Sequence, residues 1–150
     1  MNRILWDDYA MRLAIVASLR SEDPYMRVGA CGLNKQNRVI GVAYNGLASG
    51  KIVDTEFWKD RDKRRPFMIH AEANLLSLIK KDECHLLACT LLPCSNCATL
   101  IAAHGIKRVI YSELYDKDKK GLEIFDFYGI EHKKIWLWIQ KTQKMFRKYQ

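Results

Sequence analysis

Helical and strand-like patterns alternate through the second half of the chain, and this alternation is the strongest constraint on its fold. The predicted segments follow one another as helix 71–81, strand 86–92, helix 95–104, strand 108–111 and helix 122–128. A strand, a helix and a second strand in succession normally form a parallel crossover. We therefore predict an α/β fold in which helices cover both faces of a central sheet.

The first half of the chain predicts a helix and a hairpin. Apolar residues spaced three and four apart indicate an amphipathic helix over residues 5–19. Strand-like runs at 28–33 and 38–44, separated by four polar residues, predict a hairpin, which would make the sheet mixed. Residues 45–66 read as a long loop, which makes them a candidate substrate lid. Residues 134–150 are predicted to form an amphipathic helical tail.

Length, charge and cysteine content narrow the class of protein. The 150 residues suit one domain, 1–150, and no apolar run approaches the roughly 18 residues that a membrane span needs. Asp7 and Asp8 stand where a signal peptide would be apolar, so we expect a cytoplasmic protein without a membrane partner. A net charge of +8 attracts polyanions or phosphorylated small molecules. Five cysteines, an odd number, favour reduced thiols over a disulfide framework.

Two short strings carry the residues of a metal site. His70-Ala71-Glu72 and Pro93-Cys94-Ser95-Asn96-Cys97 each stand where a helix is expected to begin. Cys94 and Cys97 are three residues apart and so share a face of the first turn, where the helix dipole favours thiolates. With His70 they offer three ligands, which leaves one zinc position open, as in catalytic sites. Glu72 is then placed to move a proton.

A structural zinc site is the alternative explanation of these strings. A lone C-x-x-C is weak evidence, but a structural site needs a fourth cysteine or histidine. The remaining cysteines and histidines form no second C-x-x-C or H-x-x-x-H pair, although Cys84 with His85 could contribute to another metal site. Cys31 and Cys89, like Cys84, lie in or beside apolar runs and are better explained as buried small hydrophobes. An H-x-E string followed by P-C-x-x-C is the signature of zinc nucleobase deaminases.

The chain resembles the deoxycytidylate (dCMP) deaminases of the cytidine-deaminase superfamily over roughly residues 5–133. The resemblance is carried by the strings SEDPYMRVGACGL, VIGVAYNGLASG, MIHAEANLL, TLLPCSNCATLI and GIKRVIYSELYD. It implies a three-layer α/β/α sandwich of the cytidine-deaminase type with a mixed sheet. It also implies zinc-dependent hydrolysis of dCMP, and of dCTP as a further candidate substrate, to the deoxyuridine nucleotide and ammonia, a step in thymidylate supply.

The resemblance also implies roles for individual residues. His70, Cys94 and Cys97 would bind Zn²⁺ and Glu72 would shuttle protons; Asn45 would hold the deoxyribose, Tyr115 would lie near the sugar-phosphate and Arg27 would bind the 5′-phosphate. Family members are often hexamers, activated by dCTP and inhibited by dTTP through the glycine-bounded loop. This chain departs from the family there, with Ala48 in place of proline and Lys51 where cysteine is frequent. Met26 and Ile69 are further departures.

Rival functions share part of this evidence. A deaminase of tRNA adenosine or single-stranded nucleic acid would have the same zinc strings, although no RNA-binding module is evident and no nucleic-acid partner is expected. A deaminase of another small ring, such as guanine or a riboflavin precursor, and a non-enzymatic zinc-stabilised nucleic-acid-binding protein remain open. The basic residues Arg61, Lys63, Arg64 and Arg65 are typical of a solvated loop, but their place before His70 also suits a nucleotide-facing role.

Overall fold

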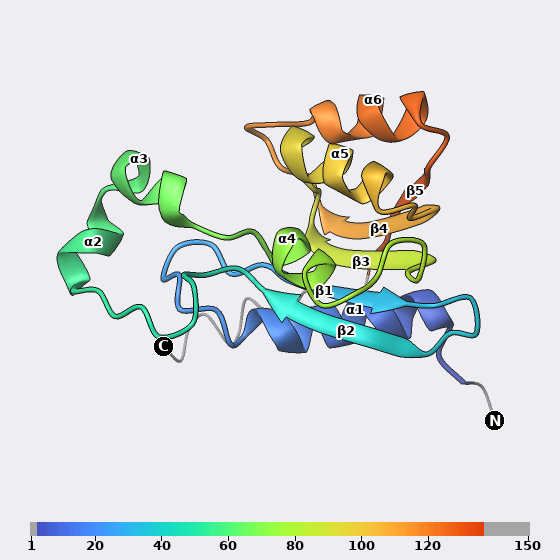
Figure 1. The fold of residues 1–150 in the computed structure, drawn as a ribbon, viewed down its shortest axis with the longest axis horizontal. Helices are drawn as coiled ribbons and strands as arrows, with labels where there is room; N and C mark the ends of the chain where they lie inside the picture. Colours follow the sequence, from blue (N-terminus) through green and yellow to red (C-terminus); the bar gives the residue numbers. More distant parts are fainter. Residues whose placement is uncertain (1–2, 137–150) are drawn as a thin grey trace.

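The computed structural model describes residues 3–136, which form a five-stranded sheet flanked by helices (Figure 1). The strands are β1 (Gly29–Leu33), β2 (Val39–Tyr44), β3 (Leu86–Leu91), β4 (Arg108–Glu113) and β5 (Glu131–Lys134). The helices are α1 (Trp6–Ser18), α2 (Thr55–Lys59), α3 (Arg61–Arg64), α4 (Ala71–Leu76), α5 (Ser95–Ala103) and α6 (Lys120–Phe127), with a 3-10 turn, η1, at Arg65–Phe67.

The sheet is mixed, as predicted, with the strand order β2-β1-β3-β4-β5. β1 pairs antiparallel with β2, its hairpin partner, and with β3. β4 pairs parallel with β3 and with β5, and the connecting helices α5 and α6 make the two crossovers. The carboxyl ends of β3 and β4 therefore lie at the same edge of the sheet, the usual place for a ligand site in an α/β fold.

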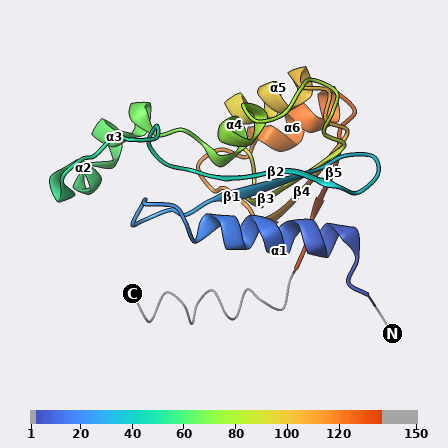
Figure 2. The ribbon, with the colours of Figure 1, turned by 60° about the horizontal axis from the view of Figure 1, so that its bottom comes forward.

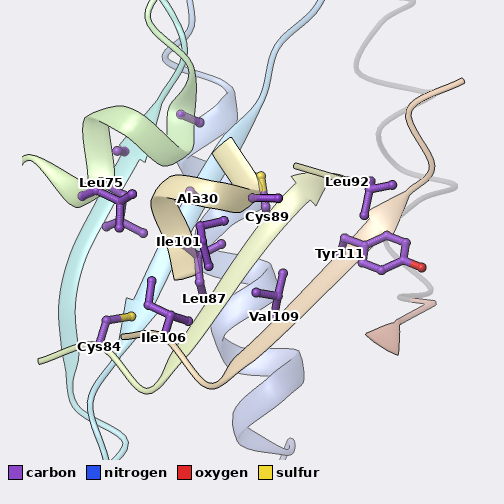
Figure 3. Packing of buried hydrophobic residues seen from close by; sticks show 14 of the residues in the cluster. Ala30, Leu75, Cys84, Leu87, Cys89, Leu92, Ile101, Ile106, Val109 and Tyr111 are labelled. Carbon is purple, nitrogen blue, oxygen red and sulfur yellow. The ribbon is translucent and has the colours of Figure 1, made fainter. Parts of the chain in front are cut away.

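Helices cover both faces of the sheet, so the predicted three-layer arrangement is confirmed. In Figure 2, α1 runs along one face and α4, α5 and α6 lie across the other. Side chains of β3 alternate between the two faces: Leu87 and Cys89 join the core under α5, while Leu86 and Ala88 join the core against α1. Figure 3 shows Leu87 and Cys89 beside Ile101 of α5.

The close approach of α1 to β1 depends on Gly29. A Cβ atom at this position would lie 1.8 Å from the carbonyl oxygen of Ala14 and 2.7 Å from the amide nitrogen of Ser18. Both are backbone atoms, which cannot move without shifting the helix. Gly29 therefore sets the spacing between α1 and the sheet.

Residues 45–66 contain more regular structure than the sequence predicted. α2 and α3 lie in this segment and continue into η1, beyond one end of the sheet (Figure 1). Asp54 and Asp60 cap the two helices, each accepting backbone N–H hydrogen bonds through its carboxylate. The prediction of a loop was wrong because helices of five and four residues are too short to establish a helical period.

The predictions for the last helix and the tail also need correction. α4 ends at Leu76, five residues before the predicted end of 71–81. Lys134 closes β5, a strand that the sequence did not predict, and does not begin a helix. Ile135 is then buried in the core beside α1, and the rest of the predicted tail helix, 137–150, lies outside the described residues. No described helix combines the length and apolar character that a membrane span requires.

Candidate active site

Two helix N-termini converge to form the site. His70 is the residue before α4 and Cys94 the residue before α5, so each lies at the first turn of its helix. The position of His70 is fixed from the preceding residue, because Ile69 exchanges two backbone hydrogen bonds with Gly46 just beyond β2, at 2.8 and 3.0 Å. Cys94 follows the carboxyl end of β3 after two residues, Leu92 and Pro93.

The structure brings together the three predicted metal ligands. Nδ1 of His70 lies 3.5 Å from Sγ of Cys94 and 3.4 Å from Sγ of Cys97, and all three atoms lie within 4.8 Å of one another. Zinc bonds of about 2.0 Å to nitrogen and about 2.3 Å to sulfur at tetrahedral angles place such atoms about 3.6 Å apart, so the residues fit zinc. No other group of three potential ligands occurs within residues 3–136, and a second site at Cys84 and His85 is not found there.

Contacts within the cluster shift the pKa values of its two cysteines in opposite directions. Hydrogen bonding from the Cys97 thiol, and then from His70, outweighs partial burial and lowers the pKa of Cys94 to about 4. The pKa of Cys97 is raised, first by its hydrogen bond to Cys94 and then by burial. The hydrogen bond to Cys94 also raises the pKa of His70. The lowered pKa of Cys94 favours its thiolate, the form in which cysteine binds a metal.

Glu72 lies in the first turn of α4, two residues after His70, and its side chain is buried at 4% exposure. Burial is the largest influence on its carboxyl group and raises the pKa of Glu72, although its own backbone N–H and nearby His70 act in the opposite direction. A carboxyl group whose pKa is raised holds a proton more readily, which suits a group that accepts and returns one. The role of Glu72 as a proton carrier stays a prediction.

A cavity of about 700 Å³ opens over the cluster. His70, Glu72 and Cys94 border it together with residues from other parts of the chain: the segment between α1 and β1, the carboxyl ends of β2 and β3, the α3–η1 segment and the loop after β4. Its volume suits a mononucleotide-sized ligand. The α3–η1 segment therefore forms a wall of the cavity, and the part of it within 45–66 belongs to the predicted substrate lid, whose closure stays a prediction.

Two of the three predicted substrate-binding residues border this cavity. Asn45 is buried, its Oδ1 accepting a 2.9 Å hydrogen bond from the amide of Val28 and its Nδ2 donating a 2.8 Å bond to the carbonyl of Met26. One N–H and one lone pair of that amide stay open to a ligand. Tyr115 lies in the loop after β4, where its hydroxyl accepts a 3.3 Å hydrogen bond from Arg61. Arg27 is half-buried and is not among the lining residues.

A buried ion pair joins the cavity wall to the body of the protein, and the sequence did not reveal it. Nη1 of Arg64 donates to Oδ2 of Asp23 at 2.6 Å, and both side chains are buried. Oδ1 of Asp23 accepts from the amides of Tyr25 and Met26, at 2.8 and 3.1 Å. Of the basic residues 61–65, Arg64 therefore has a structural role, whereas Lys63 is exposed to solvent.

Asp118 makes a second connection that sequence reasoning missed. Its Oδ2 accepts hydrogen bonds from the amide and the hydroxyl of Ser95, both at 2.8 Å, and Oδ1 accepts from the amide of Lys120. These bonds lower the pKa of Asp118, the Ser95 amide having the largest effect. The loop after β4 is thereby tied to the first turn of α5, between Cys94 and Cys97.

The other three cysteines are buried, as predicted. Cys31, Cys84 and Cys89 are buried, and burial raises the pKa of both Cys31 and Cys84 to about 12. His104 ends α5, with Nε2 lying 3.1 Å from the carbonyl oxygen of Ile79.

Fold and site together define a zinc-dependent deaminase domain, and comparison with known proteins places it more closely. A family model described as the cytidine and deoxycytidylate deaminase zinc-binding region matches residues 4–113. The deoxycytidylate deaminase of Pongo abelii is 33% identical over 143 residues, a match that spans 87% of this chain and 79% of the relative. The deoxycytidylate deaminase of Mycobacterium phage D29 is 34% identical over 128 residues, spanning 74% of this chain and 97% of the relative.

A solved structure agrees with these relatives. The crystal structure of dCMP deaminase from the cyanophage S-TIM5, in complex with dCMP and dUMP, superposes with a TM-score of 0.76 at 27% identity and covers 90% of this chain and all of that one. The chain belongs to the deoxycytidylate deaminases of the cytidine-deaminase superfamily, which confirms the family, fold class and zinc cofactor predicted from the sequence.

Proposed function

We propose that the chain hydrolyses dCMP to dUMP and ammonia. The observation that carries this proposal is the buried Glu72 carboxyl group beside the His70, Cys94 and Cys97 cluster, in a cavity of mononucleotide size. Relatives named deoxycytidylate deaminases and a neighbouring structure with dCMP and dUMP support the choice of substrate.

Glu72 performs the proton transfers in this reaction. When bound by His70, Cys94 and Cys97, zinc supplies a Lewis acid that lowers the pKa of water from about 15.7 to about 7. One carboxylate oxygen of Glu72 accepts the proton released by water and delivers it to N3 of the cytosine ring. The oxygen of water bonds to C4 as a hydroxyl group. Glu72 then takes the proton of that hydroxyl group and gives it to the amino group at C4, so that the C4–N bond breaks, ammonia leaves and the oxygen stays as the uracil carbonyl.

The cavity walls bind the rest of the nucleotide. Asn45 contacts the deoxyribose through the N–H and lone pair that its backbone contacts leave open, and Tyr115 lies at the sugar-phosphate end. Arg27 stays a prediction for the phosphate, with its place outside the cavity lining as evidence against it. dCTP is a further candidate substrate because the cavity is open to solvent beside exposed basic residues, Arg65 and Lys117.

Assembly and regulation follow from the family. The chain forms a homo-oligomer, of which a hexamer is the favoured form, and its 45–51 segment is the place where dCTP and dTTP would act. Residues 1–150 form one domain, an expectation supported by one sheet carrying a core on each face within residues 3–136. Size-exclusion chromatography with light scattering, with and without dCTP or dTTP, tests the hexamer and its response to each nucleotide.

Steady-state ammonia release from dCMP, dCTP and deoxycytidine tests the proposed reaction. Glu72→Gln keeps the zinc ligands and removes the proton carrier, so turnover of dCMP falls about 10²- to 10⁴-fold with zinc content unchanged by elemental analysis. Glu123→Gln, an exposed change of the same kind on α6, keeps full turnover. Undiminished turnover of Glu72→Gln would refute the role of Glu72. Ammonia from guanine or an oligonucleotide, with none from dCMP, would refute the substrate.

A further inference from the structure

Four basic side chains line the cavity, and they differ in what neutralises them. Arg64 is buried against Asp23 at 2.6 Å, so its charge is already compensated. Within residues 3–136, the one acidic contact of Arg61 is with Asp62, at 3.9 Å, a side chain that is 90% exposed to solvent. Arg65 and Lys117 are exposed at the same cavity.

The acidic residues of the cavity are largely committed elsewhere. Asp23 is held by Arg64 and two backbone amides, and Asp118 by Ser95 and the amide of Lys120. Glu72 is buried beside the metal ligands. Asp62 also borders the cavity, but its side chain is 90% exposed and lies 3.9 Å from Arg61. The wall formed by Arg61, Asp62 and Arg65 therefore carries a net positive charge.

Arg61 is the basic residue with a fixed direction into the cavity. Its Nη2 donates a 3.3 Å hydrogen bond to the hydroxyl of Tyr115, which joins the α3 wall to the loop after β4. This contact uses one of the five donors of the guanidinium group, and the Tyr115 hydroxyl can itself donate to a ligand. A guanidinium beside a phenol suits a phosphate oxyanion, which accepts charge-assisted and bidentate hydrogen bonds.

The helix that carries Arg61 is anchored and does not move freely. Arg64, three residues further on, makes the buried ion pair with Asp23 and lies over the rings of Tyr25 and Trp58, at 5.1 and 5.8 Å from their centroids. Asp60 caps the same helix by accepting from the amides of Asp62 and Lys63. The backbone that carries Arg61 is therefore held at both ends of α3, and the hydrogen bond to Tyr115 orients the guanidinium group, which favours binding of a ligand there.

We propose that Arg61, held beside Tyr115, binds the 5′-phosphate and is the residue that gives this chain its preference for nucleotides over nucleosides. The inference rests on the proposed function, because it assigns the phosphate subsite of the same cavity. It moves the phosphate from Arg27, which lies outside the lining, to the α3 wall, and Arg65 and Lys117 add to the positive potential there.

Paired substrates test this assignment. Arg61→Gln lowers kcat/KM for dCMP by about 10- to 100-fold, the effect of losing charge-assisted hydrogen bonds, and leaves kcat/KM for deoxycytidine unchanged. Arg61→Lys recovers part of the loss, because it restores the charge without the planar fork. Lys63→Gln is the matched control, because it removes the same charge from the same helix but lies outside the cavity lining. It leaves kcat/KM for dCMP and for deoxycytidine unchanged.

Each alternative result has a defined meaning. If kcat/KM in Arg61→Gln falls equally for dCMP and deoxycytidine, or falls for neither, the assignment is overturned. If kcat/KM for dCMP falls selectively in Arg27→Ala and not in Arg61→Gln, the phosphate is assigned to Arg27. Wild-type protein that releases no ammonia from dCMP overturns the proposed function instead. In that case calorimetric titration with dCMP still decides the site, since unchanged affinity in Arg61→Gln overturns it and weaker affinity supports it.

Discussion

Replacing Asp23 by asparagine tests whether the buried ion pair holds the cavity wall in place. Asparagine keeps the shape of the side chain and an oxygen that can accept from the amides of Tyr25 and Met26. It removes the charge that faces Nη1 of Arg64 at 2.6 Å. The substitution therefore isolates the ion pair from the turn that the same side chain organises.

The expected loss follows from the burial of both partners. The side chains of Asp23 and Arg64 are only 4% and 7% exposed, so the guanidinium group is left uncompensated away from bulk water. Breaking a buried pair on one side costs about 3–5 kcal/mol. Because Arg64 borders the cavity, where water can approach it, we expect the lower end, about 3 kcal/mol.

Urea denaturation followed by circular dichroism measures this loss as a fall in the free energy of unfolding. Lys63→Gln, which removes an exposed partner of Asp60 on the same helix, costs less than about 1 kcal/mol. Asp23→Asn combined with Arg64→Met recovers stability, since neither charge is then left alone. A loss in Asp23→Asn no larger than that of Lys63→Gln would show that the pair does not anchor the wall.

Three further predictions concern the core and the cysteines. Gly29→Ala lowers the free energy of unfolding, measured by urea titration, by about 3 kcal/mol, the upper end of the cost of overpacking, because the added Cβ would overlap the backbone of α1. Folding raises the pKa of Cys31 and Cys84 from 9.0 to about 12, so the unfolded chain releases these protons at lower pH than the folded chain. The free energy of unfolding therefore falls as the pH rises from 9 to 12, and the urea midpoint measured against pH follows it. A urea midpoint that stays constant over this range would contradict the prediction. Removing zinc with a chelator makes Cys94, which is only partly buried and has a lowered pKa, reactive toward a thiol reagent, while the buried Cys31, Cys84 and Cys89 react only on unfolding.

The parts of the fold that the sequence predicted are those that local patterns encode. The stripe of α1, the hairpin and the strand–helix alternation after residue 70 all have periods long enough to detect. β5 reads Glu-His-Lys-Lys, with no apolar alternation, because it lies at the edge of the sheet and only His132 is even partly buried. Its place depends on pairing with β4, which no local pattern records.

The site divides in the same way. The metal ligands and Glu72 lie in two compact strings whose spacing alone indicates zinc chemistry. Asp23 and Arg64 lie 41 residues apart, and no spacing rule connects them. Arg64 also shares its run with Lys63, which is exposed, so composition could not separate the buried residue from its solvated neighbour. Arg27 was favoured by its place before β1, but being close in sequence to a strand does not make a side chain face the cavity.

The two hydrogen bonds between Gly46 and Ile69 make the backbone just beyond β2 part of the support for the histidine ligand. We therefore expect zinc binding at His70 to stabilise this β-bridge. Slower amide exchange at Gly46 and Ile69 on adding zinc would measure how much of the binding free energy is spent in closing the β-bridge.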